Sequence, residues 1–292
     1  MSIINVERLR LLARMFTRPV FASLAKTGDW EHALAFLAGH NVLQVGPTQT
    51  IGDLFDSAWV QLRKHYRNEY VYKAELTNRL IFGRHSPRTA ALHVEMPVGR
   101  SIVDLAVFNG TSTAYEIKTE FDSARRLQTQ TSDYLKVFDK VFVVSHPSMA
   151  ASFCEAVDIR VGVLCLNQRG SLTVIKDAHS NVEHLEPRAV FRCLHRVEYV
   201  EAAQAATGRE MIYPNGLIAE KCEEIFSSLT PAERHAVFVD SLRRRRTDVK
   251  ISGFVSGLPP SLRVVGYATP LSGRQMETAL SVLAKEASVA IT

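Results

Sequence analysis

An acid and a lysine stand one residue apart near the centre of the chain, in the run Glu116-Ile117-Lys118. The surrounding segment is apolar and typical of a β-strand, where residues two positions apart point to the same face. A carboxylate beside an ammonium group can hold a hard cation, while the lysine orients water or stabilises charge at phosphorus. These two residues therefore suggest a site for phosphodiester hydrolysis.

A second acid, Asp104, interrupts the preceding apolar segment, IVDLAVF. A charge inside such a run needs a partner or a metal ion, because burying an isolated charge is costly. Two carboxylates supply oxygen ligands, which suit Mg²⁺ or Mn²⁺ better than zinc. The alternative interpretation of Glu116 and Lys118 is a surface ion pair at the end of a strand.

The two acids can share one face of the sheet only in one register of the predicted hairpin. A strict two-residue turn at Asn109-Gly110 would turn Asp104 away from Glu116, because a slip of one residue flips every side chain. A three-residue loop with a left-handed Gly110 places Phe108 opposite Ser112 and Asp104 opposite Glu116. We predict this second register.

The elements around these residues predict an α/β domain with a mixed central sheet flanked by helices. Strands are predicted over 90–98, 101–108, 112–118, 140–145, 160–166 and 171–176. A helix is predicted from caps at Asp122 and Ser123 to about Phe138, and a short one over 147–156.

Helical patterns precede and follow this strand-rich part. They are predicted over 6–16, 31–39, 52–66 and 70–82, then over 188–207, 217–228, 231–246 and 273–288. A loop is expected at Gly46-Pro47, and 253–272 is expected to be loop-rich because it is rich in Gly and Pro. Three regions follow from this pattern: a helical N-terminal extension (1–50), a core (51–178) and a mainly helical C-terminal region (179–292).

The order of Asp104, a hairpin and Glu116-Ile117-Lys118 resembles the core motif of the PD-(D/E)XK nuclease superfamily, which includes restriction and repair endonucleases. The longer order, with EIK, RL, Q, Y and VFDKV, also resembles a bacterial family of nuclease-like proteins. The resemblance covers roughly residues 70–145. Val103 stands where the name of the motif has proline, a common variation in this superfamily.

This resemblance implies a restriction-endonuclease-like core and a magnesium-dependent endonuclease, a hydrolase that acts on DNA rather than RNA. It implies Asp104 and Glu116 as metal ligands, Lys118 as the residue that positions water, and Glu75 as a third carboxylate. It also implies that Gln130 and Tyr134, one helical turn apart, orient the water, the lysine or a phosphate.

Each added residue has a simpler interpretation. Glu75 can be a solvated helix residue paired with Arg79 four positions later, and Gln130 and Tyr134 can form the polar edge of a packing helix. Glu95 is a rival acid on the first predicted strand. A further set of arginines flanks the site and is expected to contact phosphates, or else to be ordinary solvated charge: Arg100, Arg125 and Arg126.

Composition and the absence of several motifs limit the classes of function that the chain can have. The 292 residues are 46% hydrophobic and carry a net charge of +5, which permits a polyanionic partner without proving one. The expectation is a cytoplasmic protein, because no apolar run is long enough to span a membrane and the four cysteines are scattered. No G-x-S-x-G elbow, His-pair metal motif or Gly-rich phosphate loop is present.

Two other functions remain open at the level of sequence. The core could be a non-catalytic module that binds nucleic acid or protein, since fold does not fix function. It could also be a defence or toxin-type effector nuclease held inactive by a regulatory partner. The helical regions at both ends are candidates for substrate recognition or for homo-oligomer contacts.

Overall fold

The structure is a computed structural model that describes residues 6–38, 40 and 48–287. The predicted end of a helix at Gly39, the predicted loop at Gly46-Pro47 and the last predicted helical residue, 288, lie outside the described residues. The described chain forms two compact units, one made of residues 1–88 and 248–292 and the other of residues 89–247. Their boundaries differ from the predicted domains, because the chain leaves the first unit and later returns to it.

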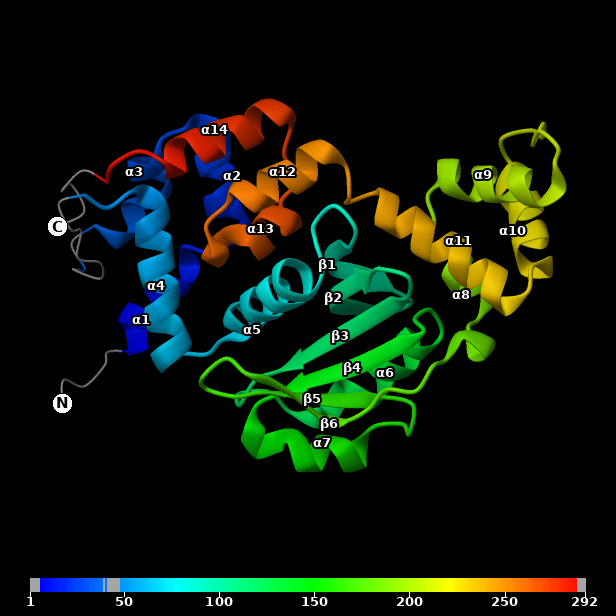
Figure 1. Ribbon diagram of the computed structural model, residues 1–292, viewed down its shortest axis with the longest axis horizontal. Helices are drawn as coiled ribbons and strands as arrows, with labels where there is room; N and C mark the ends of the chain where they lie inside the picture. Colours follow the sequence, from blue (N-terminus) through cyan, green and yellow to red (C-terminus); the bar gives the residue numbers. More distant parts are fainter. Residues whose placement is uncertain (1–5, 39, 41–47, 288–292) are drawn as a thin grey trace. The chain divides into compact units, whose positions relative to one another are not determined.

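The second unit is built on a sheet of six strands. They are β1 (Ala91–Val98), β2 (Ser101–Phe108), β3 (Ser112–Lys118), β4 (Lys140–Ser145), β5 (Gly162–Leu166) and β6 (Leu172–Lys176). The strands follow one another across the sheet in chain order (Figure 1). Strands β3, β4 and β5 are parallel, and the other neighbours are antiparallel. The predicted α/β class with a mixed sheet is confirmed.

The helices of this unit cover the sheet and extend its core. They are η3 (Ala124–Arg126), α6 (Leu127–Leu135), η4 (Pro147–Met149), α7 (Ala150–Ala156), η5 (Val182–His184), α8 (Pro187–Phe191), α9 (Arg196–Thr207), α10 (Ile218–Ser228) and α11 (Pro231–Arg244). One hydrophobic core joins Phe108 and Val143 of the sheet to Phe153 of α7, Phe226 of α10 and Phe238 of α11. Helices α8 to α11 therefore belong to the same unit as the sheet.

The first unit is helical. It comprises α1 (Val6–Arg14), α2 (Arg18–Thr27), α3 (Trp30–Ala33), η1 (Ala35–Leu37), α4 (Ile51–His65), α5 (Glu69–Thr77), the π-helical η2 (Asn78–Arg84), α12 (Val249–Gly257), η6 (Pro260–Leu262), α13 (Arg263–Ala268) and α14 (Gly273–Leu283). The segments from the two ends of the chain pack together, with Phe21 of α2 against Phe254 of α12. Among the described helices, none has the length and apolar character needed to cross a membrane.

Candidate active site

The inner face of β3 changes from apolar to charged toward its C-terminal end. Ala114 on this face belongs to the hydrophobic core, together with Ala106 and Phe108 of β2. Glu116 and Lys118 continue the same face, because side chains alternate along a strand. Glu116 is 2% exposed and Lys118 is 9% exposed, so both charges are removed from water and depend on protein partners.

The hairpin between β2 and β3 has the predicted register. Phe108 pairs with Ser112, and the loop Asn109–Thr111 holds Gly110 at φ 72°. The amide of Asn109 donates to the carbonyl of Thr111 across this three-residue loop. Continuing the register brings Asp104 opposite Glu116, so the two acids share one face.

Asp104 stands where the pairing of β2 with β3 has ended and its pairing with β1 is interrupted for one position. Pairing with β3 ends at Leu105, and pairing with β1 skips the position opposite Glu95. The amide of Ile117 donates to Oδ2 of Asp104 at 2.7 Å. The carboxylate of Asp104 thus accepts a backbone hydrogen bond at the point where β2 and β3 separate.

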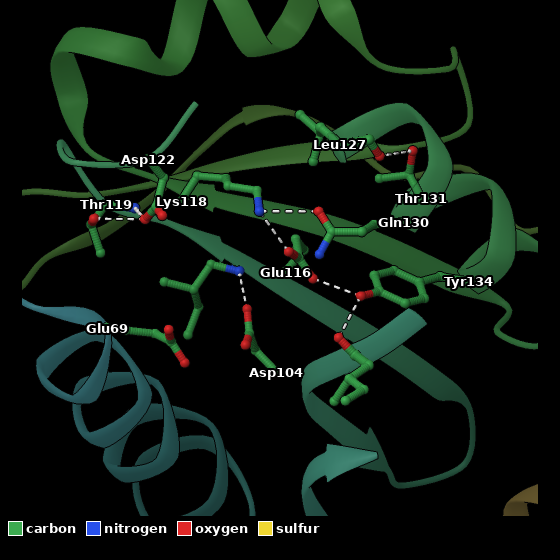
Figure 2. A network of polar contacts seen from close by, with 12 residues as sticks. Glu69, Asp104, Glu116, Lys118, Thr119, Asp122, Leu127, Gln130, Thr131 and Tyr134 are labelled. Atoms are coloured by element: carbon green, nitrogen blue, oxygen red, sulfur yellow. Dashed lines mark hydrogen bonds and ion pairs between the residues drawn. The ribbon is translucent and has the colours of Figure 1, made fainter. Parts of the chain in front are cut away.

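Lys118 connects the strand to helix α6. Its Nζ donates to Oε1 of Glu116 at 2.7 Å and to Oε1 of Gln130 at 3.1 Å. Figure 2 shows these three side chains pointing toward one another from β3 and α6. The ammonium group is therefore held between a carboxylate and an amide, close to the surface, where Gln130 is half-buried.

Tyr134, one turn after Gln130, completes the network. Its hydroxyl lies 2.7 Å from Oε2 of Glu116 and 2.6 Å from the carbonyl oxygen of Ile102 in β2 (Figure 2). Burial raises the pKa of Tyr134 well above its usual value, and the negative charge of Glu116 adds to this shift. The phenol is therefore a neutral donor and not a base.

A residue that the sequence did not single out, Asp133, fixes helix α6 on the β1–β2 hairpin. Its Oδ2 accepts from the hydroxyl of Ser101 at 2.8 Å and from the amide of Arg100 at 3.3 Å. Gly99 in the same turn has φ 60° and lies close to this carboxylate. Asp133 is 8% exposed. The sequence signal that could have identified it is an acid directly before Tyr134 in a helix that packs on the sheet, because acids are rarely buried without a partner.

Glu75 belongs to the other compact unit, on helix α5. Its Oε1 lies 3.4 Å from Nη1 of Arg63, and its Oε2 lies 3.7 Å from Nε of Arg79. The expected pairing with Arg79 is confirmed. Glu75 is 5% exposed, however, so its interpretation as a solvated helix residue is wrong.

The remaining residues predicted around the site are exposed. Arg100 lies in the β1–β2 turn, and Arg125 and Arg126 form the 3₁₀ turn η3 that leads into α6. The rival acid, Glu95, is also exposed, and its backbone has φ 55°, which is uncommon for a residue other than glycine.

The donor set can be compared with the needs of a metal ion. Asp104 and Glu116 offer two carboxylates, and no group of three or more His, Cys, Asp or Glu suited to a metal occurs in the described part of the chain. Magnesium keeps several waters and commonly uses one or two protein carboxylates, so these residues fit Mg²⁺ or Mn²⁺. In this structure both oxygens of Glu116 accept hydrogen bonds, one from Lys118 and one from Tyr134.

A serine, a histidine and an aspartate also meet elsewhere in this unit. Ser112 Oγ lies 3.0 Å from Nε2 of His235 and accepts from the amide of Asp139 at 3.0 Å. Ser112 is fully buried, so a substrate has no access to its hydroxyl. This cluster therefore ties helix α11 to the start of β3 and is not a nucleophilic site.

The chain matches the model of a known protein family. The family model described as Bacteriophage P4 protein cII matches residues 62–252, more than half of the chain. Protein cII of Enterobacteria phage P4 is 39% identical to it over 61 residues, which are 21% of this chain. The match spans 23% of the length of that relative. No solved structure matches the chain.

Proposed function

The chain belongs to the bacteriophage P4 protein cII family, and we propose that it is a metal-dependent nuclease that hydrolyses phosphodiester bonds. The observation that carries the proposal is the buried contact between Lys118 and Glu116, with Asp104 on the same face at the point where β2 and β3 separate. Charged groups buried at the end of a sheet need a reason beyond packing, and a hydrolytic site supplies one.

The proposed roles follow from the contacts. Asp104 and Glu116 would hold Mg²⁺ or Mn²⁺, which supplies an activated water and neutralises charge at phosphorus. Lys118 reaches the surface side of the pair, where its ammonium can orient the attacking water or meet a phosphate oxygen. Gln130 offers Lys118 a second acceptor, so the ammonium remains positioned when Glu116 binds another group.

The remaining proposed roles concern position and substrate. Tyr134 holds the carboxylate of Glu116 as a neutral donor. DNA is the proposed substrate rather than RNA, on the resemblance to PD-(D/E)XK nucleases. The exposed arginines of the β1–β2 turn and η3 would contact phosphates.

The test is a cleavage assay on single- and double-stranded DNA and RNA in Mg²⁺, Mn²⁺ or EDTA. We expect cleavage that needs the metal and falls at least about a hundredfold in Asp104→Asn and in Lys118→Ala. Lys140→Ala, which removes a lysine from the neighbouring strand β4, is the matched control and should remain active. Metal-dependent cleavage that persists in both site variants would refute the assignment.

One observation favours a second candidate, a binding module without catalysis. Both carboxylate oxygens of Glu116 already have hydrogen-bond donors, as expected for a purely structural ion pair. Calorimetric titration with Mn²⁺ separates the two candidates. A nuclease should bind Mn²⁺ in a way that Asp104→Asn abolishes, whereas a structural pair should give the same heat in wild type and variant.

A further inference from the structure

The segment that follows Lys118 presents an aromatic ring to solvent. Phe121 is 66% exposed, in the loop of residues 119–123 between β3 and η3. A singly exposed apolar side chain is ordinary on a protein surface, so the exposure alone carries no argument. The inference rests instead on the hydrogen bonds within this loop and on its position directly after Lys118.

The loop is held in one conformation by its own polar groups. Oδ2 of Asp122 accepts from the amide of Thr119 at 2.9 Å and from its hydroxyl at 2.7 Å. The amide of Phe121 donates in turn to Oγ1 of Thr119 at 3.2 Å. Figure 2 shows Thr119 and Asp122 directly beside Lys118. The backbone that carries Phe121 is thus fixed to the end of the strand that carries the site.

Two acids, Glu120 and Asp122, flank Phe121 directly, and two arginines follow on its C-terminal side. Arg125 and Arg126 are both exposed and follow it within five residues. Phe121 is three positions after Lys118, so their Cα atoms lie within about 11 Å of each other. A strand bound by its phosphate at Lys118 would therefore pass close to the ring.

We propose that Phe121 stacks on an unpaired nucleobase of the bound strand, while Arg125 and Arg126 contact its phosphates. Aromatic rings interleaved with basic side chains are the usual components of sites for single-stranded nucleic acid. The bases of an intact duplex are stacked on one another, so the ring selects single-stranded or locally unpaired substrate. This inference rests on the proposed function, because it concerns a nucleic acid at the same site.

The test measures binding without cleavage. A fluorescein-labelled 20-nucleotide single strand of DNA, the same strand in RNA, and a blunt DNA duplex are titrated with the full chain in EDTA and followed by anisotropy. The variants are Phe121→Ala, Phe121→Leu and Phe121→Trp. Val174→Ala, which trims another exposed apolar side chain in β6, is the control.

We expect Phe121→Ala and Phe121→Leu to weaken single-strand binding about tenfold and to leave duplex binding unchanged. Phe121→Trp should bind as wild type, and its added tryptophan fluorescence should be quenched by the single strand. The proposal is overturned if wild type does not bind the single strand, if Phe121→Ala binds as wild type, or if Phe121→Leu retains full affinity.

The two proposals fail separately. Binding that depends on Phe121 in a chain that does not cleave would remove the nuclease assignment and leave the stacking site. Cleavage that depends on Asp104 and is unchanged in Phe121→Ala would remove the stacking site and leave the nuclease assignment.

Discussion

The hydroxyl of Tyr134 lies 2.7 Å from Oε2 of Glu116 and links helix α6 to the buried carboxylate of β3. The same hydroxyl lies 2.6 Å from the carbonyl oxygen of Ile102 in β2. One phenol thus joins the helix to both strands of the hairpin that carries the two acids. Because burial and Glu116 raise the pKa of Tyr134, the phenol keeps its proton at neutral pH.

Tyr134→Phe should lower the free energy of unfolding by about 1–2 kcal/mol, because the buried Oε2 of Glu116 loses its hydrogen-bond donor. Cleavage should weaken less than in Lys118→Ala, since the phenol positions Glu116 and is not required to touch substrate. Urea unfolding and the cleavage assay measure the two effects. Tyr199→Phe is the control, a tyrosine whose ring stacks on Phe191 at 4.9 Å. Equal stability losses in the two variants would contradict the role given to Tyr134.

The pair Lys118–Glu116 should show strong coupling in a double-mutant cycle. Lys118→Met alone leaves the buried carboxylate of Glu116 without its ion partner and should cost about 3 kcal/mol. Adding Glu116→Gln should recover much of this loss, because no unpaired charge remains. Cleavage should be absent from all three variants, so stability returns without activity. Additive losses in urea unfolding would show that the two groups do not depend on each other.

The geometry of the site could be predicted from the sequence because a few residues fix it. Gly110 allows the left-handed position that the loop needs, and the face of Asp104 then follows from the pairing of Phe108 with Ser112. Strands 101–108, 112–118 and 140–145 were predicted to the residue because alternation or continuous apolar character marks both ends.

Two helical segments were predicted wrongly, because packing between residues distant in the chain determines their structure. Residues 253–272 were predicted to be loop-rich, and this is wrong, since most of them lie in α12, η6 and α13. A Cβ on Gly266 would lie 2.4 Å from Leu258, so this glycine permits close helix packing and does not mark a turn. The predicted helix over 188–207 is likewise divided into α8 and α9.

The role of the polar side chains that follow β3 was also ambiguous from the sequence. Asp122 was predicted to cap the helix after β3, but its carboxylate binds the amide and hydroxyl of Thr119 instead. Ser123 stands at the N-cap of η3 without a side-chain hydrogen bond to it. An acid after a strand can close a loop or cap a helix, and only the folded backbone distinguishes the two.

Glu95→Gly should be more stable than Glu95→Ala by about 0.5–1 kcal/mol. The backbone of Glu95 has φ 55°, which costs about 1–2 kcal/mol for a residue with a Cβ, and glycine removes this strain at some cost in chain entropy. Glu95→Ala is the matched control, since it removes the carboxylate and keeps the strain. Thermal and urea unfolding should rank the glycine variant above the alanine variant. Equal stability of the two variants would mean that the backbone of Glu95 is not strained.

His93 should make the stability of the sheet unit depend on pH. Its Nε2 lies 2.8 Å from the carbonyl oxygen of Leu242 and ties β1 to α11, and burial lowers the pKa of His93 to about 4. The unfolded chain takes up a proton near pH 6.5, well before the folded one does, so the stabilisation is complete above pH 6.5 and is lost as pH falls toward 4. The loss amounts to about 3 kcal/mol over this range.

The test is urea unfolding of wild type and His93→Gln at pH 8, 6.5, 5.5 and 4.5. Glutamine can still donate to Leu242 but does not titrate, so the difference between the two curves isolates His93 from other histidines with lowered pKa, such as His235. Wild type should lose stability faster than His93→Gln between pH 6.5 and 4.5, and the two should run in parallel above pH 7. Parallel curves throughout would mean that His93 binds its proton equally well in the folded and unfolded chain.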